Sequence, residues 1–158
     1  MDQRELDELL KANPDLRVDG GERPVPARAV ETQTWTVNIQ AYGKARPRVT
    51  QNGQHTYMPA AYEAWKGEFL ASSPTLRVSP PYGVKVLIVR AIPKSGANRT
   101  QRVGAPCVTK PDGDNVIGSI MDALLGDDSA VVEGAWRKVW GMDHALRVTV
   151  WHIADGRL

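Results

Sequence analysis

The chain has 158 residues, of which 42% are hydrophobic and 24% charged, and its net charge is +2 at neutral pH. This composition is typical of one globular domain with a proper core, and the single cysteine, Cys107, excludes a disulfide framework and a zinc site built from four cysteines. No apolar run approaches the roughly 20 residues of a membrane span and the N-terminus has no hydrophobic signal region, so we expect a cytoplasmic protein without membrane contact.

Residues 1–31 are predicted to form an N-terminal extension, and residues 32–158 the main domain. Residues 3–12 carry leucines at helical spacing and are followed by Asn13 and Pro14, so the extension is predicted to be a short helix or to be disordered. Residues 19–26 hold two Gly and two Pro in a polar setting, which is typical of a linker.

The main domain is predicted to open with a strand and a helix. From Gln33 to Ile39, apolar residues alternate with polar ones in the period of a half-buried strand. Residues 41–59 are irregular and basic, and Pro47 opposes a regular helix there. Residues 60–72 carry a loose apolar stripe, which predicts a helix.

The second half begins with residues 84–92, whose β-branched run predicts a strand. Residues 93–109 are typical of a long loop. Apolar residues at i, i+3, i+4 and i+7 from Ile117 predict the clearest helix of the chain, with Gly126 as a fitting residue just past its end.

Two further strands are predicted over residues 130–140 and 145–153, and residues 141–144 between them have the length and composition of a hairpin connection. The resulting order is strand, helix, strand, helix, strand, strand. We therefore expect an α+β fold with a mixed sheet of about four to six strands and two main helices packed on one face.

Carboxylates are concentrated around the clearest helix. Hard oxygen ligands favour Mg²⁺ or Mn²⁺ over zinc, and Mg²⁺ is typically held by one or two carboxylates plus waters and substrate phosphates. Asp112 or Asp114 is also a fitting N-cap, and the alternative to a metal site is a helix cap followed by a solvated turn. Asp128 can approach that pair only if residues 126–128 turn back along a helix about 18 Å long, or if the helix is shorter than its pattern indicates. Residues 112–133 contain no Lys or Arg and six acidic residues, namely Asp112, Asp114, Asp122, Asp127, Asp128 and Glu133.

Two stretches without acidic residues surround this cluster. Residues 32–62 carry three Lys or Arg residues, and the stretch from Phe69 to Pro111 carries seven. Basic surface beside a carboxylate cluster is what a phosphodiester substrate requires, although ordinary solvated faces are the alternative. The best candidates for contacts with DNA phosphates are Lys44, Arg46, Arg48, Lys94, Arg99 and Arg102.

Several motifs, in the same order along the chain, resemble the signature of the RusA-type Holliday junction resolvases. That family has a basic element, a Thr-Tyr-x-Pro element, a Pro-Asp-x-Asp-Asn element, a helix with Asp-Ala-Leu, an Asp-Asp pair and a Lys before an aromatic residue and Gly. The resemblance runs from about Thr34 to Ile153. The motifs that carry it are Gly43-Lys-Ala-Arg-Pro-Arg, Thr56-Tyr-Met-Pro, Lys110-Pro-Asp-Gly-Asp-Asn, Asp122-Ala-Leu, Asp127-Asp and Lys138-Val-Trp-Gly.

The resemblance implies an enzyme, a Mg²⁺- or Mn²⁺-dependent crossover junction endodeoxyribonuclease that resolves Holliday junctions and related branched DNA by symmetric hydrolysis. It also implies a homodimer, because a two-fold symmetric junction needs two equivalent active sites. Asp112, Asp114 and Asp128 take the positions of the family's catalytic metal ligands. For Asp122, a helix-orienting role is the alternative to metal ligation. The candidate supporting residues are Asp127, Asp122, Lys110 and Lys138.

One position departs from the family pattern. Four residues after Asp114 the family usually has a catalytic Lys, whereas this chain has Gly118. A Lys there would help to stabilise charge on the phosphate, so slower chemistry is expected unless Lys110 or Lys138 reaches the site. Gly118 keeps one alternative open, a junction-binding protein with weak or lost catalysis. A separate alternative keeps the nuclease chemistry and changes the substrate to flaps or forks.

Overall fold

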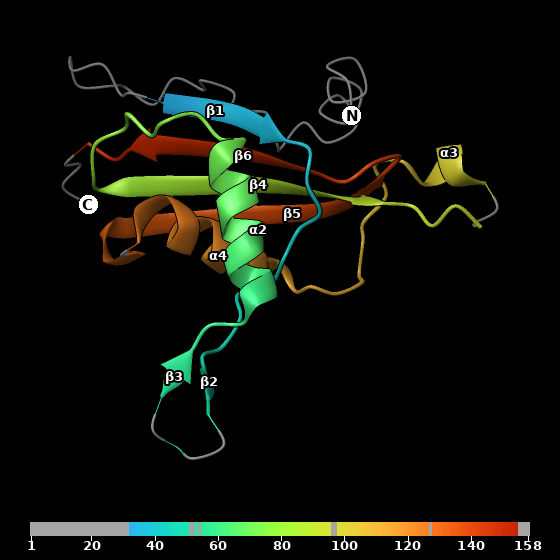
Figure 1. Ribbon diagram of the computed structural model, residues 1–158. Coiled ribbons are helices and arrows are strands. Elements are labelled where there is room, and N and C mark those ends of the chain that lie inside the picture. Colours follow the sequence, from blue (N-terminus) through green and yellow to red (C-terminus); the bar gives the residue numbers. More distant parts are fainter. Residues whose placement is uncertain (1–31, 51–52, 54, 96–97, 127, 155–158) are drawn as a thin grey trace.

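The computed structural model describes residues 32–50, 53, 55–95, 98–126 and 128–154, so the predicted N-terminal extension, with its helix and linker, lies outside the described residues. The main sheet has four strands, which Figure 1 shows side by side with helices α2 and α4 packed against them. The elements are β1 (Thr32–Val37), β2 (Arg48–Val49), β3 (Thr56–Tyr57), α2 (Ala60–Ala71), β4 (Tyr82–Ala91), α3 (Arg99–Arg102), α4 (Gly113–Leu125), the 3-10 turn η2 (Asp128–Ala130), β5 (Val131–Gly141) and β6 (Ala145–His152).

The main sheet is mixed and has the strand order β1-β6-β4-β5. Strand β6 pairs antiparallel with both β1 and β4, whereas β4 and β5 run parallel. Parallel neighbours need a crossover connection, and the segment that contains α4 supplies it. This crossover packs α4 against β5, and Asp114 at the start of the helix lines a hollow together with Trp136 of that strand.

The last two strands are present as predicted, but the hairpin pairing between them is wrong. Strands β5 and β6 are not neighbours, because β4 lies between them. Ile88 on one face of β4 and Val89 on the other are fully buried, and a strand buried on both faces is most stable in the centre of a sheet. Residues 142–144 can span two strand spacings, about 10 Å, as readily as they close a hairpin. The chain leaves β5 close to β4, since a Cβ on Gly141 would lie 2.4 Å from Cγ1 of Val89.

Two segments that we expected to be irregular contain short regular elements. Strands β2 and β3 pair antiparallel within residues 41–59, and α3 forms a helix of 4 residues within residues 93–109. The N–H of Thr50 donates to the carbonyl of His55 at 2.8 Å and closes the small β2–β3 hairpin. Elements this short produce no periodic pattern in the sequence, so they could not be predicted from it. In Figure 1 both project from the body of the domain.

The two main helices and one face of the main sheet form the core, which confirms the predicted layering. Tyr62, Trp65 and Phe69 of α2 are buried, as are Val116 and Ile120 of α4. They pack in one cluster with inward-facing residues of β4 and β6. Burial of these aromatic and aliphatic side chains is the main stabilising contribution to this layer. No helix in the part of the chain that the structure describes is long and apolar enough to cross a membrane.

Candidate active site

The start of α4 presents two carboxylates. Asp112 occupies the N-cap with an extended backbone (φ −68°, ψ 144°), and Asp114 lies in the first turn. The Asp112 side chain makes no capping hydrogen bond, so its carboxylate is not used to satisfy the helix N–H groups. Both residues are exposed, and they line one hollow together with Trp136 and Lys138 of β5. The positive end of the helix dipole stabilises their negative charge at this place.

Strand β5 holds the start of α4 in position. The Lys138 ammonium donates hydrogen bonds to the carbonyl oxygens of Thr109 and Pro111, the second at 2.8 Å. Gly113 lies against the Trp136 ring so closely that a Cβ would be 2.3 Å from Cε3 of the indole. In this arrangement Lys138 supports the backbone that leads into the helix.

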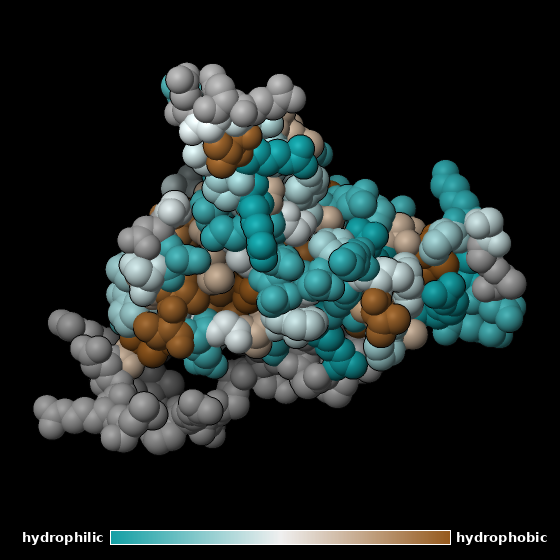
Figure 2. Space-filling view, turned by 90° about the horizontal axis from the view of Figure 1, so that it is seen from below, coloured by the Kyte–Doolittle hydropathy of each residue, from teal (hydrophilic) through white to brown (hydrophobic). Residues whose placement is uncertain are grey.

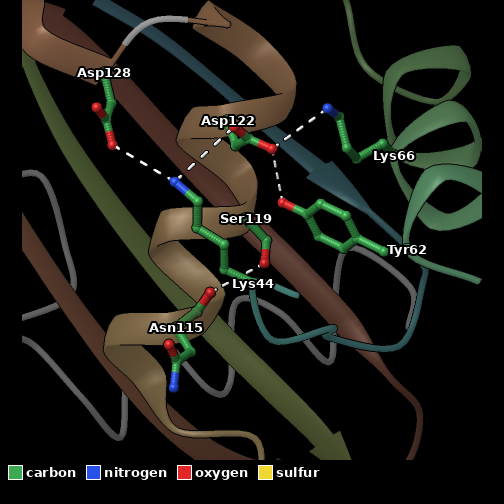
Figure 3. Close-up of polar contacts among 7 residues, drawn as sticks. All are labelled: Lys44, Tyr62, Lys66, Asn115, Ser119, Asp122 and Asp128. Carbon is green, nitrogen blue, oxygen red and sulfur yellow. Dashed lines mark hydrogen bonds and ion pairs between the residues drawn. The ribbon is translucent and has the colours of Figure 1, made fainter. Parts of the chain in front are cut away.

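Farther along α4, Lys44 crosses the helix from the segment that follows β1 (Figure 3). Its backbone N–H donates to the Asn115 carbonyl at 2.9 Å, and its side chain passes over Gly118, where a Cβ would lie 3.4 Å from Cδ of Lys44. The ammonium then lies 3.9 Å from a carboxylate oxygen of Asp122 and 3.9 Å from one of Asp128. The Asp128 side chain therefore points back along α4.

Asp122 joins α4 to α2. The Tyr62 hydroxyl donates to its Oδ2 at 2.8 Å, and the Lys66 ammonium lies 3.3 Å from the same oxygen. Burial acts to raise the pKa of Asp122, but the bond from Tyr62 and the charges of Lys66 and Lys44 outweigh it and hold the pKa below its usual value. Burial and the bond to Asp122 raise the pKa of Tyr62 to about 12, so the phenol remains a donor at neutral pH. These contacts favour the helix-orienting role of Asp122 over metal ligation.

The three carboxylates of the expected metal site border two adjacent hollows. Asp112 and Asp114 line the first and Asp128 lines the second, while Trp136 borders both. Within the described residues, no group of three His, Cys, Asp or Glu side chains could hold a metal ion by itself. Asp127, a candidate supporting residue, lies outside the described residues.

The donor chemistry of Asp112 and Asp114 fits Mg²⁺ or Mn²⁺ without a third protein ligand. Mg²⁺ is usually bound by one or two carboxylates, and waters and substrate phosphates complete its coordination. Two exposed carboxylates beside an open hollow meet this requirement. Zinc is disfavoured, because the pair offers only hard oxygen ligands.

The predicted DNA-contacting residues lie in separate parts of the structure. Figures 1 and 2 show the arm that carries α3 at one end of the molecule, and Figure 2 shows mainly hydrophilic residues on it. The Arg102 guanidinium lies 4.8 Å from the centre of the Trp140 ring, and Arg99 donates to the Ile92 carbonyl at 3.4 Å. The exposed candidates are Lys44 beside α4, Arg46 and Arg48 at the β2–β3 hairpin, and Lys94 after β4; Lys110, a candidate supporting residue, is also exposed and precedes α4.

Sequence reasoning missed Arg90, which lies near the end of β4. Its Nε and Nη1 atoms, like Nε of Arg99, are buried and have no hydrogen-bond partner within the described residues. Because these N–H groups are buried, they are not open to a DNA phosphate in this structure. Its place in an alternating strand pattern gave no signal of this burial.

An α+β domain that has a pair of carboxylates on one helix and basic residues on its projecting segments has the features of a nuclease. The family model described as Endodeoxyribonuclease RusA matches residues 38–151, which is most of the chain. The chain therefore belongs to the RusA endodeoxyribonuclease family, and this confirms the resemblance carried by its motifs. Membership implies endodeoxyribonuclease activity on Holliday junctions. No curated protein matches the sequence.

Proposed function

We propose that this protein is a divalent-metal-dependent endonuclease that resolves Holliday junctions and related branched DNA by symmetric cutting. The observation that carries the proposal is the pair Asp112 and Asp114 at the start of α4, inside the span that matches the RusA family. The basic residues of the β2–β3 hairpin and the α3 arm support it, because they can neutralise the phosphates of DNA duplexes that reach the carboxylates.

Asp112 and Asp114 would hold Mg²⁺ or Mn²⁺, and Asp128 is the third carboxylate that we propose for the catalytic region, although it lines the adjacent hollow and not that of the pair. The bound metal would neutralise charge on the scissile phosphate and lower the pKa of a coordinated water. Lys138 and Trp136 keep the start of α4 against β5, so both carboxylates stay fixed relative to the DNA. This preorganisation is needed because small displacements of a catalytic group reduce the rate strongly.

A homodimer is part of the proposal, because two equivalent sites are needed to cut a two-fold symmetric junction. Strand β5 is at the edge of the main sheet and carries Val132, which is 62% exposed. Val108, on the segment beside β5, is 93% exposed. Exposed apolar residues at a sheet edge suit contact with a second copy. Light scattering after size-exclusion chromatography measures the mass directly, and a monomer at micromolar concentration would count against symmetric cutting.

The proposal is tested by incubating the protein with a synthetic four-way junction, a fork, a flap and a linear duplex, each with Mg²⁺, Mn²⁺ or a chelator. We expect metal-dependent incision of the junction, and a loss of about 100-fold in the rate for Asp114→Asn with junction binding retained. Glu68→Gln is the matched control, because it removes an exposed carboxylate from α2. If none of the four DNAs is cut by the wild type in a way that Asp114→Asn abolishes, the proposed activity is wrong.

The second candidate is a junction-binding protein with weak or lost catalysis. It is favoured by Gly118, which leaves α4 without a side chain one turn after Asp114. It predicts tight, salt-sensitive binding of the junction and no incision with either metal.

Faster cutting of the fork or flap than of the junction would instead support a nuclease with a different branched substrate.

A further inference from the structure

The acidic face of α4 is neutralised by a cation that comes from a distant part of the chain. Residues 112–133 contain no Lys or Arg, so the carboxylates within and after α4 have no cation among their near neighbours in sequence except Lys110, which precedes the helix. In the structure the Lys44 ammonium lies 3.9 Å from Asp122 and 3.9 Å from Asp128 (Figure 3). Lys44 therefore pairs with one of the proposed catalytic carboxylates, that of Asp128.

Two glycines allow this approach. A Cβ on Gly43 would lie 3.2 Å from Cβ of Pro111, so the absence of a side chain lets this segment lie against the residues that lead into α4. The Lys44 N–H then bonds to the Asn115 carbonyl at 2.9 Å. At Gly118 the helix has no side chain either, and the aliphatic part of Lys44 crosses it at van der Waals distance. The backbone is thus held to the helix while the ammonium reaches the far side of Gly118.

Two other lysines near α4 are engaged elsewhere. The Lys138 ammonium donates to the carbonyl oxygens of Thr109 and Pro111. The Lys66 ammonium binds Asp122 at 3.3 Å from the α2 side, where it lies 5.7 Å from the centre of the Tyr62 ring. Neither arrangement directs the charge toward Asp128, which makes Lys44 the best placed of these cations.

The ion pairs of Lys44 are weak enough to be exchanged for a phosphate. Its side chain is 42% exposed, that of Asp128 is 51% exposed, and both contacts are at the outer limit of an ion pair. Exposed pairs of this kind contribute only about 0 to 1 kcal/mol. A DNA phosphate offers charge-assisted hydrogen bonds that are stronger, so the ammonium can turn to it without a large loss in stability.

We propose that Lys44 is a catalytic residue whose ammonium crosses Gly118 and contacts the scissile phosphate, where it stabilises the negative charge that develops during hydrolysis. The inference rests on the proposed nuclease function and adds a residue to it. It assigns to Lys44 a role different from that proposed for the arginines of the β2–β3 hairpin and of the α3 arm, which would contact DNA away from the carboxylates. No covalent bond to Lys44 forms, and its proton stays on the ammonium.

Three variants test the role. Lys44→Met keeps the aliphatic part over Gly118 and removes the charge. Lys44→Ala combined with Gly118→Lys places an ammonium on α4 itself, and the shortened side chain at position 44 leaves room for it. Lys66→Met is the matched control, because it removes the other ammonium on Asp122 from outside the proposed site.

Cleavage of the four-way junction is measured as a single-turnover rate at saturating protein, alongside the junction Kd and the Tm of each variant. We expect Lys44→Met to lower the rate by about 100-fold, the loss typical for removal of a group that stabilises transition-state charge, while the Kd changes about 3-fold or less. The double variant should cut about 10-fold faster than Lys44→Ala alone, and Lys66→Met should cut at close to the wild-type rate.

The result separates this inference from the proposed function. If the wild type and Lys66→Met cut the junction and Lys44→Met cuts it equally fast, the role of Lys44 is wrong and the nuclease assignment stands. A defect of Lys44→Met that disappears at saturating protein would also overturn the role, because it would make Lys44 a binding contact only. A wild type that does not cut with either metal overturns both.

Discussion

The hydrogen bond between Tyr62 and Asp122 joins α2 to α4, and Tyr62→Phe is expected to reveal its contribution to stability. Tyr62 is 0% exposed, and its hydroxyl donates to Asp122 at 2.8 Å. A hydrogen bond to a charged group contributes about 1.5 to 3 kcal/mol net. The Asp122 side chain is 25% exposed and keeps Lys66 as a partner, so the lower end of that range, about 1.5 kcal/mol, is expected here. For a domain of this size the loss corresponds to roughly 5 °C in Tm.

The assay is a double-mutant cycle of Tyr62→Phe and Asp122→Ala, with urea unfolding followed by tryptophan fluorescence. Trp65 reports on the site, because its ring stacks on Tyr62 with 6.3 Å between the ring centres. We expect a coupling energy of about 1 kcal/mol. The pKa of Asp122 is lowered in the folded state, so its contribution is present above the unfolded pKa of about 4 and is lost as the pH falls through the folded pKa. A coupling energy near zero at pH 7 would refute the role of this bond in joining the helices.

Two further predictions concern pH and salt. Burial and, after it, the charge of Arg90 lower the pKa of His144 in the folded protein. The unfolded state therefore binds the proton more readily, and the wild type loses stability as the pH falls below about 6.5. His144→Asn should make this loss of stability smaller. Asn keeps an acceptor for the Ala91 N–H, and unfolding midpoints with the same pH slope in both proteins would contradict this. Arg102→Ala should weaken junction binding and reduce the salt dependence by about one counterion in anisotropy titrations, whereas an unchanged slope would exclude a phosphate contact by Arg102.

The strongly periodic elements were predictable from the sequence with nearly correct boundaries. The helix expected over residues 60–72 is α2 (Ala60–Ala71), and the strand expected over residues 145–153 is β6 (Ala145–His152). The spacing of apolar residues along each element shows which of its faces is buried, and this spacing can be read from a few neighbouring residues. The small β2–β3 hairpin and α3 lack such a period, since each is stabilised by a few contacts only.

Pairing was harder to predict than the elements themselves. The connection over residues 141–144 has a length that suits a hairpin, yet β4 lies between the strands that it joins. Local sequence could not decide between these arrangements, because the same few residues span either distance. The burial of both faces of β4 decided the strand order, because all four strands compete for the central position.

The sequence by itself determined the family, the periodic helices and strands, and the type of chemistry, because Asp112, Asp114 and the basic stretches carry their charge wherever the chain places them. Only the tertiary structure decided which cation meets which carboxylate. Lys44 faces Asp128 because the chain after β1 lies along α4 and because Gly118 leaves the space that its side chain crosses. Contacts between residues so far apart in sequence depend on the packing of whole elements, which no local pattern records.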